Sequence, residues 1–270
     1  MSADVVRSAS PVEQATAKSF SERLAELTAR IEFRRADAEE DREAIFRLRY
    51  RAYLREGAIG PNSAERFADR DDEADNAFVL GLYIDGELAT SLRLHVASKK
   101  ATPDCPSLHV FPDILQPLLD AGNVLIDATR FVADERLSRL HRGLPYATLR
   151  LCMVAAEYFH ADHLLAPVRP EHQAFYRRAF NHRLVCEPRP YPQLAKPICL
   201  MTVHFPSAAE GLYRKYPFFR STVSERRKLF DRPRIQPAAA NVEPADLPPA
   251  PQTRGTIRPF VESGLMRATG

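Results

Sequence analysis

The stretch Leu125-Ile-Asp-Ala-Thr-Arg-Phe-Val-Ala133 determines how this sequence is interpreted. Its Leu, Ile, Phe and Val residues are typical of a buried strand, yet it also contains Asp127 and Arg130. Burying a charge is costly unless it is paired or used, so these two residues form either a structural ion pair or part of a site. Residues 135–143 follow as a basic, glycine-containing segment that leads into a helical pattern. A strand that continues through such a loop into a helix N-terminus is suited to binding a phosphate-bearing ligand.

The composition restricts the class of protein. Of the 270 residues, 45% are hydrophobic and 27% are charged, as in an ordinary soluble globular protein, and a net charge of +3 does not favour a nucleic-acid binder. The four cysteines lie far apart without a CxxC pair, so neither a metal site nor a disulfide framework is expected. The N-terminus lacks an apolar signal, and no segment approaches the length of a membrane span. We therefore expect a cytoplasmic protein that is not an integral membrane protein.

Four parts are predicted along the chain. Residues 1–18 are small and polar and are predicted to be disordered, and 19–206 form a folded domain with a leading helix. Residues 207–231 are predicted to form a C-terminal helix. The segment 232–270 is predicted to be a disordered tail because it is rich in proline.

Apolar periodicity predicts a mixture of strands and helices within the folded domain. The clearest feature is a hairpin, in which Asp85-Gly86 joins strands at 77–84 and 88–97 through a tight turn. The other predicted strands are 31–36, 124–132, 163–168, 183–187 and 198–204, and the predicted helices are 20–31, 39–57, 111–121, 145–160 and 173–180. This order predicts an α+β architecture, with a mixed, mostly antiparallel central sheet flanked by helices.

The order of elements resembles the GNAT acyltransferase fold. Four motifs resemble the branch of that fold that contains acyl-homoserine-lactone (autoinducer) synthases and long-chain N-acyl amino acid synthases. They are Arg49-Tyr-Arg-Ala-Tyr53, Asp72-Glu-Ala-Asp75, Ser91-Leu-Arg-Leu94 and Asp127-Ala-Thr-Arg130. The acid that precedes the paired acids in the lactone synthases would fall at Arg70, and the Glu of their fourth strand is replaced by Asp127. These departures favour a resemblance to the long-chain N-acyl tyrosine synthases.

The resemblance implies an N-acyltransferase that moves a fatty acyl group from an acyl carrier protein or CoA thioester to the amine of an amino acid, a small-molecule acceptor. It implies no permanently bound cofactor. Asp127 and Asp75 are the candidate bases for the acceptor amine, and Tyr176 is the candidate acid for the leaving thiolate. Each acid also has a structural interpretation, since Asp127 can form an ion pair with Arg130 and Asp75 lies in an acidic loop.

The resemblance also implies binding residues. The candidates for the amino acid are Arg49, Tyr53, Asp72, Arg93 and Arg130, and the three arginines could each hold a carboxylate through two hydrogen bonds. The candidates for the acyl donor are the backbone of Phe131, Val132 and Ala133 and the phosphate-facing Arg139, Arg142 and Gly143. A solvated helix face is the alternative for Arg49.

Acyl carrier proteins are acidic, so the basic region 177–234 has a plausible partner. The predicted helix within 211–230 could bind the carrier protein, or could simply cap the fold. Two further functions remain open: autoinducer synthesis, and binding of acyl carriers without turnover. The second is suggested by a degenerate glycine loop, in which Pro145 stands where a second glycine is expected.

The spacing of Asp127 and Arg130 makes a prediction about strand geometry. Side chains of a regular strand alternate between its faces, so residues three apart lie on opposite faces. Relatives of the resembled fold commonly interrupt the fourth strand where the thioester enters. We therefore predict a β-bulge between Asp127 and Arg130 that breaks the pairing at Ala128 and Thr129 and turns both charges toward one site.

Overall fold

The computed structural model describes residues 20–191 and 194–231. The predictions of a disordered N-terminus and a disordered tail therefore lie outside the described residues.

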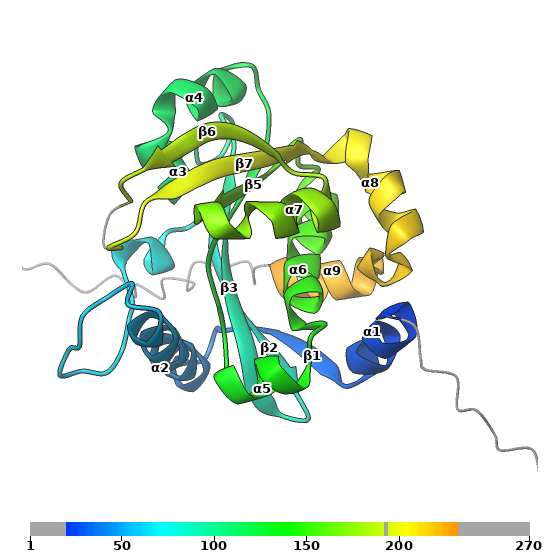
Figure 1. The fold of residues 1–270 in the computed structure, drawn as a ribbon. Helices are drawn as coiled ribbons and strands as arrows, with labels where there is room; N and C mark the ends of the chain where they lie inside the picture. The colour runs from blue at the N-terminus through cyan, green and yellow to red at the C-terminus, as the bar shows by residue number, and fades with distance from the viewer. Residues whose placement is uncertain (1–19, 192–193, 232–270) are drawn as a thin grey trace, which may run out of the picture. The chain divides into compact units, whose positions relative to one another are not determined.

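A seven-stranded sheet forms the centre of the fold (Figure 1), in the order β1-β2-β3-β4-β5-β7-β6. Its strands are β1 (Ile31–Arg35), β2 (Ala77–Ile84), β3 (Glu87–Ala97), β4 (Leu125–Ala133), β5 (His163–Val168), β6 (Arg183–Arg189) and β7 (Ile198–His204). Only β4 and β5 pair in parallel, and every other neighbouring pair is antiparallel. The predicted mixed, mostly antiparallel sheet is confirmed.

The predicted hairpin is also confirmed. Asp85 and Gly86 both have positive φ, +51° and +86°, which is the backbone of a two-residue turn that matches the twist of the flanking strands. This turn joins β2 to β3 and fixes the register of the strand that carries Arg93.

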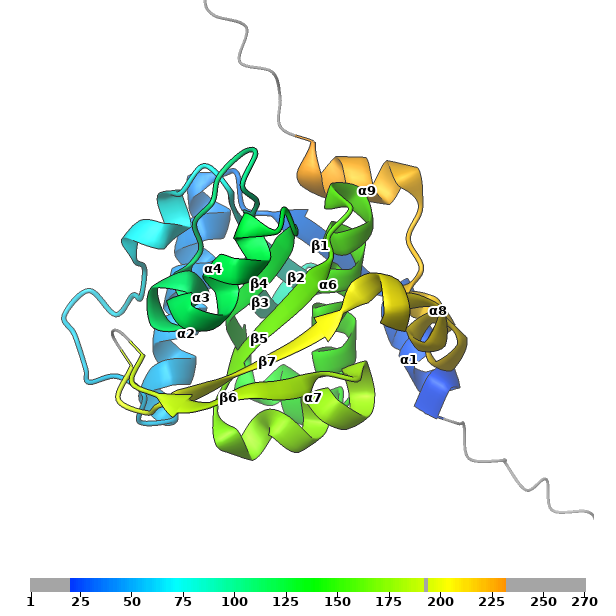
Figure 2. The ribbon, with the colours of Figure 1, turned by 90° about the horizontal axis from the view of Figure 1, so that it is seen from above.

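Helices cover both faces of the sheet (Figure 2). They are α1 (Phe20–Ala29), α2 (Glu39–Arg55), α3 (Pro106–Val110), α4 (Pro112–Asp120), α5 (Glu135–Leu140), α6 (Leu144–Phe159), α7 (Gln173–Phe180), α8 (Phe205–Lys215) and α9 (Val223–Phe230). In Figure 2, α2, α3 and α4 lie on one side of the sheet, and α6, α8 and α9 lie on the other. None of the helices described is long and apolar enough to cross a membrane.

The core lies in two main layers. On one face, apolar residues of β3 and β4, including Leu92, Leu94 and Ile126, pack with α6, which is apolar almost all round. On the other face, Leu125 and the neighbouring strands pack against α3 and α4. The charged residues of β4 therefore lie within a strand that both faces bury, as the apolar context of its sequence indicates.

The predicted C-terminal helix is instead two helices. It breaks after α8, where Pro217 begins a 3₁₀ turn, and Thr222 caps α9 by accepting a hydrogen bond from the Glu225 amide. Arg150 of α6 donates a 2.7 Å hydrogen bond to the carbonyl of Arg220. The aromatic side chains here, such as Phe219, are buried in the core, so this segment caps the fold.

A second difference concerns the basic segment after β4. It was expected to be a loop, but it contains the short helix α5, which Asp134 caps by accepting a hydrogen bond from the Leu137 amide. The predicted helix 111–121 is confirmed as α4, and the short helix α3 that precedes it was not predicted.

Candidate active site

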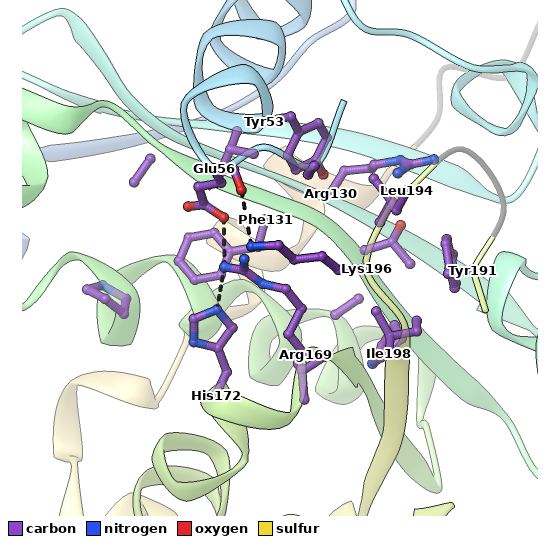
Figure 3. A pocket seen from close by; sticks show the side chains of 18 of the residues that line it. Tyr53, Glu56, Arg130, Phe131, Arg169, His172, Tyr191, Leu194, Lys196 and Ile198 are labelled. Carbon is purple, nitrogen blue, oxygen red and sulfur yellow. Dashed lines mark hydrogen bonds and ion pairs between the residues drawn. The ribbon is translucent and has the colours of Figure 1, made fainter. Parts of the chain in front are cut away.

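A cavity of about 440 Å³ lies where β4 and β5 separate. The two strands pair over only three residue pairs, the last being Asp127 with Leu165. Beyond this point, the wall of the cavity is formed by 128–133 of β4 and by Pro167 and Val168 of β5. Residues from α2 and from α7 also line it, so the cavity reaches both faces of the sheet through the split (Figure 3).

A β-bulge is present in β4, but the predicted position is wrong. Thr129 pairs with Arg93 and Ala128 pairs with Leu94 without interruption. The register shifts one step later, where Arg130 and Phe131 together oppose a single residue of β3. The backbone of Arg130 has φ of +56°, in the left-handed region that non-glycine residues occupy at a cost of about 1–3 kcal/mol.

The bulge turns Arg130 into a buried ionic network that we call the inner cluster, made of Arg49, Asp69, Asp72, Arg93 and Arg130. Asp69 accepts hydrogen bonds from both Arg93 and Arg130, the latter from Nε at 3.0 Å. Asp72 accepts two bonds from Arg49, at 2.8 and 2.9 Å. Burial alone would raise the pKa of Asp69, but the Arg130 and Arg93 guanidiniums lower it to about 2.

Of the arginines predicted to hold the acceptor carboxylate, only Arg130 lines the cavity. The side chains of Arg49 and Arg93 are fully buried and are paired with acids of the inner cluster, as is Asp72. A solvated face for Arg49 is therefore wrong. Tyr53 lines the cavity as well, so two of the five predicted acceptor-binding residues reach it.

The candidate bases lie away from the cavity. Asp127 is fully buried and accepts hydrogen bonds from the amide and hydroxyl of Ser107, at 2.8 and 2.7 Å. Burial raises its pKa, although the Ser107 bonds oppose this shift. It forms no ion pair with Arg130 within the described residues. Asp75 is exposed in the turn before β2. Neither lines the cavity, and their catalytic roles stay predictions.

Asp69 is the inner-cluster residue that sequence reasoning missed. The acid expected at Arg70 is supplied one residue earlier, since the Arg70 side chain is 84% exposed while Asp69 is almost completely buried. A usable signal was present: Asp69 and Asp72 form a capping box around a short 3₁₀ helix, Arg70–Glu73.

Tyr176, the candidate acid, lies in the wall of the cavity, and its catalytic role stays a prediction. Its ring is almost fully buried, and its hydroxyl forms no hydrogen bond within the described residues. Burial raises the pKa of this phenol above its ordinary value, so the group keeps its proton at neutral pH.

The predicted donor-binding residues divide into two groups. Phe131, Val132 and Ala133 line the cavity, whereas Arg139, Arg142 and Gly143 do not. Arg139 is exposed and pairs with Glu135 of its own helix. Gly143 is explained by packing, because a Cβ there would lie 2.8 Å from Leu24 of α1. Two neighbours of these residues, Ser138 and Pro145, do line the cavity.

A second ionic group, which we call the outer cluster, consists of Glu56, Arg169, His172 and Lys196 (Figure 3). Arg169 donates hydrogen bonds to the Glu56 carboxylate at 2.7 Å and to Nε2 of His172 at 2.9 Å. Sequence reasoning missed this cluster, because Glu56, Lys196 and the segment with Arg169 are far apart in the chain and carry no local pattern. Among the described residues, no three potential ligands gather as a metal ion would require.

Comparison with known proteins agrees with this geometry. A family model described as "N-acyl amino acid synthase FeeM" matches residues 44–204, more than half of the chain. None of the curated proteins compared with the chain matches it. The solved structure of FeeM, an N-acyl amino acid synthase from uncultured soil microbes, is 18% identical, with a TM-score of 0.56 over 67% of this chain and 94% of its own.

Two further solved structures show weaker likeness. The CoA-dependent acyl-homoserine lactone synthase BjaI is 14% identical, with a TM-score of 0.48 over 69% of this chain and 89% of its own. An acyl-CoA N-acyltransferase from Pseudomonas aeruginosa is 21% identical, with a TM-score of 0.44 over 64% of this chain and 97% of its own. The expected GNAT acyltransferase fold is confirmed. The family match shows that the chain belongs to the FeeM family of N-acyl amino acid synthases and is an acyltransferase.

Proposed function

We propose that this protein transfers a fatty acyl group from a thioester to the amine of an amino acid. The observation that supports it most is the cavity that passes through the split between β4 and β5. A thioester lying in this split would meet the acceptor from the α2 side, with the β4 backbone along one wall.

The reaction makes defined demands on the cavity. The amine nitrogen attacks the thioester carbonyl, the carbon–sulfur bond breaks, the nitrogen loses a proton and the departing sulfur gains one. Negative charge develops on the carbonyl oxygen, so backbone N–H groups aimed at it lower the barrier. The segment 131–133, which begins within the bulge and has no β5 partner, is where this proposal places such donors.

Tyr176 is suited to protonating the departing sulfur. The residue lines the cavity, its raised pKa keeps the hydroxyl protonated, and that hydroxyl has no hydrogen-bond partner among the described residues. A positioned general acid of this kind contributes about 10²- to 10⁴-fold to a rate.

We further propose that the thioester arrives on an acyl carrier protein. A groove between α2 and α5 is lined by four arginines, with the 64%-exposed Leu140 beside them and two acids opposing them. Arg55 belongs both to this groove and to the cavity. An acidic carrier seated there could pass its acyl arm into the split. The segment 211–230 is less suited to this role, because its aromatic residues are buried in the core.

The direct test is a product assay. The purified protein is incubated with long-chain acyl carrier thioesters or acyl-CoA and with each amino acid, and N-acyl products are measured by mass spectrometry. The Tyr176→Phe variant should lower kcat about 100-fold. Tyr158→Phe is the matched control, because Tyr158 bonds to Asp231 away from the cavity. No product from any donor would contradict the proposed transfer, and an unchanged kcat in Tyr176→Phe would contradict the role of the phenol.

Autoinducer synthesis is a second candidate, favoured by the acid that Asp69 supplies to the inner cluster. The same assay with S-adenosylmethionine as acceptor distinguishes it, since only this activity gives a lactone. Tight binding of an acyl carrier without release of thiol would instead indicate a binding protein.

A further inference from the structure

The outer cluster contains a cation, Lys196, that forms no salt bridge within the described residues, although the Glu171 carboxylate nearby interacts with it electrostatically. The ammonium of Lys196, just before β7, donates to the main-chain oxygen of Glu56 at 3.2 Å, and this is its single polar contact there. Arg169 bonds to the carboxylate of the same glutamate. The two cations therefore meet at Glu56, one at its carbonyl and the other at its carboxylate (Figure 3).

The other cations that line the cavity have acidic partners. Arg130 pairs with Asp69 in the inner cluster, and Arg55 lies 3.9 Å from Glu135. An anion entering the cavity therefore finds its least-compensated positive charge at Lys196.

We propose that Lys196, with Arg169 beside it, binds the α-carboxylate of the acceptor amino acid. This inference rests on the proposed function. One carbon separates carboxylate from amine in an α-amino acid, so a carboxylate held at the edge of the cavity leaves the amine directed into the split. Glu56 is the one carboxylate among the described residues of the lining, and it offers the incoming ammonium a partner.

The geometry also indicates how the site would select its acceptor. A primary amine without a carboxylate cannot neutralise Lys196 and would lose a charge-assisted hydrogen bond, a difference equivalent to about 10- to 100-fold in affinity. The aromatic and apolar residues Tyr53, Tyr191 and Leu194 also line the cavity and are available to the rest of the acceptor.

The test compares tyrosine with tyramine, which lacks the carboxylate, as acceptors for Lys196→Gln. We expect KM for tyrosine to rise about 10- to 100-fold, with kcat and KM for the acyl donor changed less than about twofold. KM for tyramine should not change, and Lys196→Arg should restore most of the affinity for tyrosine. Lys215→Gln is the matched control, because Lys215 is also exposed and donates to a main-chain carbonyl, that of Arg178, without lining the cavity.

An equal rise in KM for tyrosine and for tyramine would overturn the inference. A rise in KM for the acyl donor would also overturn it and would assign Lys196 to the donor phosphate. Titration calorimetry with tyrosine alone separates the two proposals. One outcome is that the wild type binds tyrosine, that Lys196→Gln binds it at least about 10-fold more weakly, and that no product forms with either protein. In that case the proposed transfer fails and this inference stands. If no amino acid binds and none is acylated, both fail.

Discussion

The inner and outer clusters use the same chemistry in opposite environments. The side chains of the inner cluster are at most 4% exposed, and its carboxylates each meet two arginines. In the outer cluster, Glu56 is 42% exposed and Arg169 is 20% exposed. Both clusters flank one cavity, yet burial assigns them different roles.

Burial makes the inner cluster part of the scaffold. In a low-dielectric environment, removing one member leaves an uncompensated charge, so the network holds its shape and holds the bulge at Arg130. An exposed ion pair contributes little and exchanges partners easily. The outer cluster can therefore release Lys196 and Arg169 to a ligand, whereas Arg49 and Arg93 cannot leave their acids without a large penalty.

The first prediction tests this difference directly. Replacing Asp69 by Asn should lower the free energy of unfolding by about 3–5 kcal/mol, because Arg93 and Arg130 then lose their shared counter-charge. Urea denaturation followed by circular dichroism measures it. Glu56→Gln is the control in the outer cluster and should cost less than about 1 kcal/mol. Similar losses in both variants would mean that burial does not separate the two clusters.

Sequence patterns predicted the inner cluster better than the outer one for a physical reason. Arg93 and Arg130 stand out because they interrupt apolar strands, and a charge in such a place needs a partner. Asp69 lies in an acidic run, where its capping-box spacing to Asp72 indicates the start of a helix but not that its carboxylate is buried. Lys196 and Glu56 are ordinary surface residues in the sequence, and only the fold brings them together.

The fold shows the same contrast. The hairpin turn at Asp85 is encoded by two residues and was predicted correctly, as was the β4 strand. The exact site of the bulge depends on how β4 pairs with β3 and on the ion pair between Asp69 and Arg130. Both are interactions between residues far apart in the chain. A local pattern indicates that two charges must share a face, but it does not indicate which residue is displaced.

A second prediction concerns pH. The pKa of Asp69 is lowered to about 2 in the folded protein, against about 3.9 in an unfolded chain. Its ionised form therefore stabilises the fold above about pH 4, and this contribution of about 2 kcal/mol is lost as the pH falls toward 2. Denaturation between pH 6 and pH 2.5 should show the gap between wild type and Asp69→Asn narrowing by about that amount. A constant gap would indicate that the carboxylate titrates normally in the fold.

The smallest predicted effect distinguishes the backbone strain at Arg130 from the loss of its charge. Arg130→Ala and Arg130→Gly both remove the guanidinium, but only glycine adopts a φ of +56° without strain. The glycine variant should therefore be more stable than the alanine variant by about 1 kcal/mol. At Thr129, which pairs regularly with Arg93, the order should reverse, with glycine less stable by about 0.5–1 kcal/mol. Thermal denaturation of the four variants measures both differences in stability. If the alanine and glycine variants have the same order of stability at both positions, the bulge lies elsewhere. If the opposite orders are found, the backbone strain lies at Arg130, whose side chain joins the cavity to the inner cluster. A substrate bound in the split would contact this strained residue.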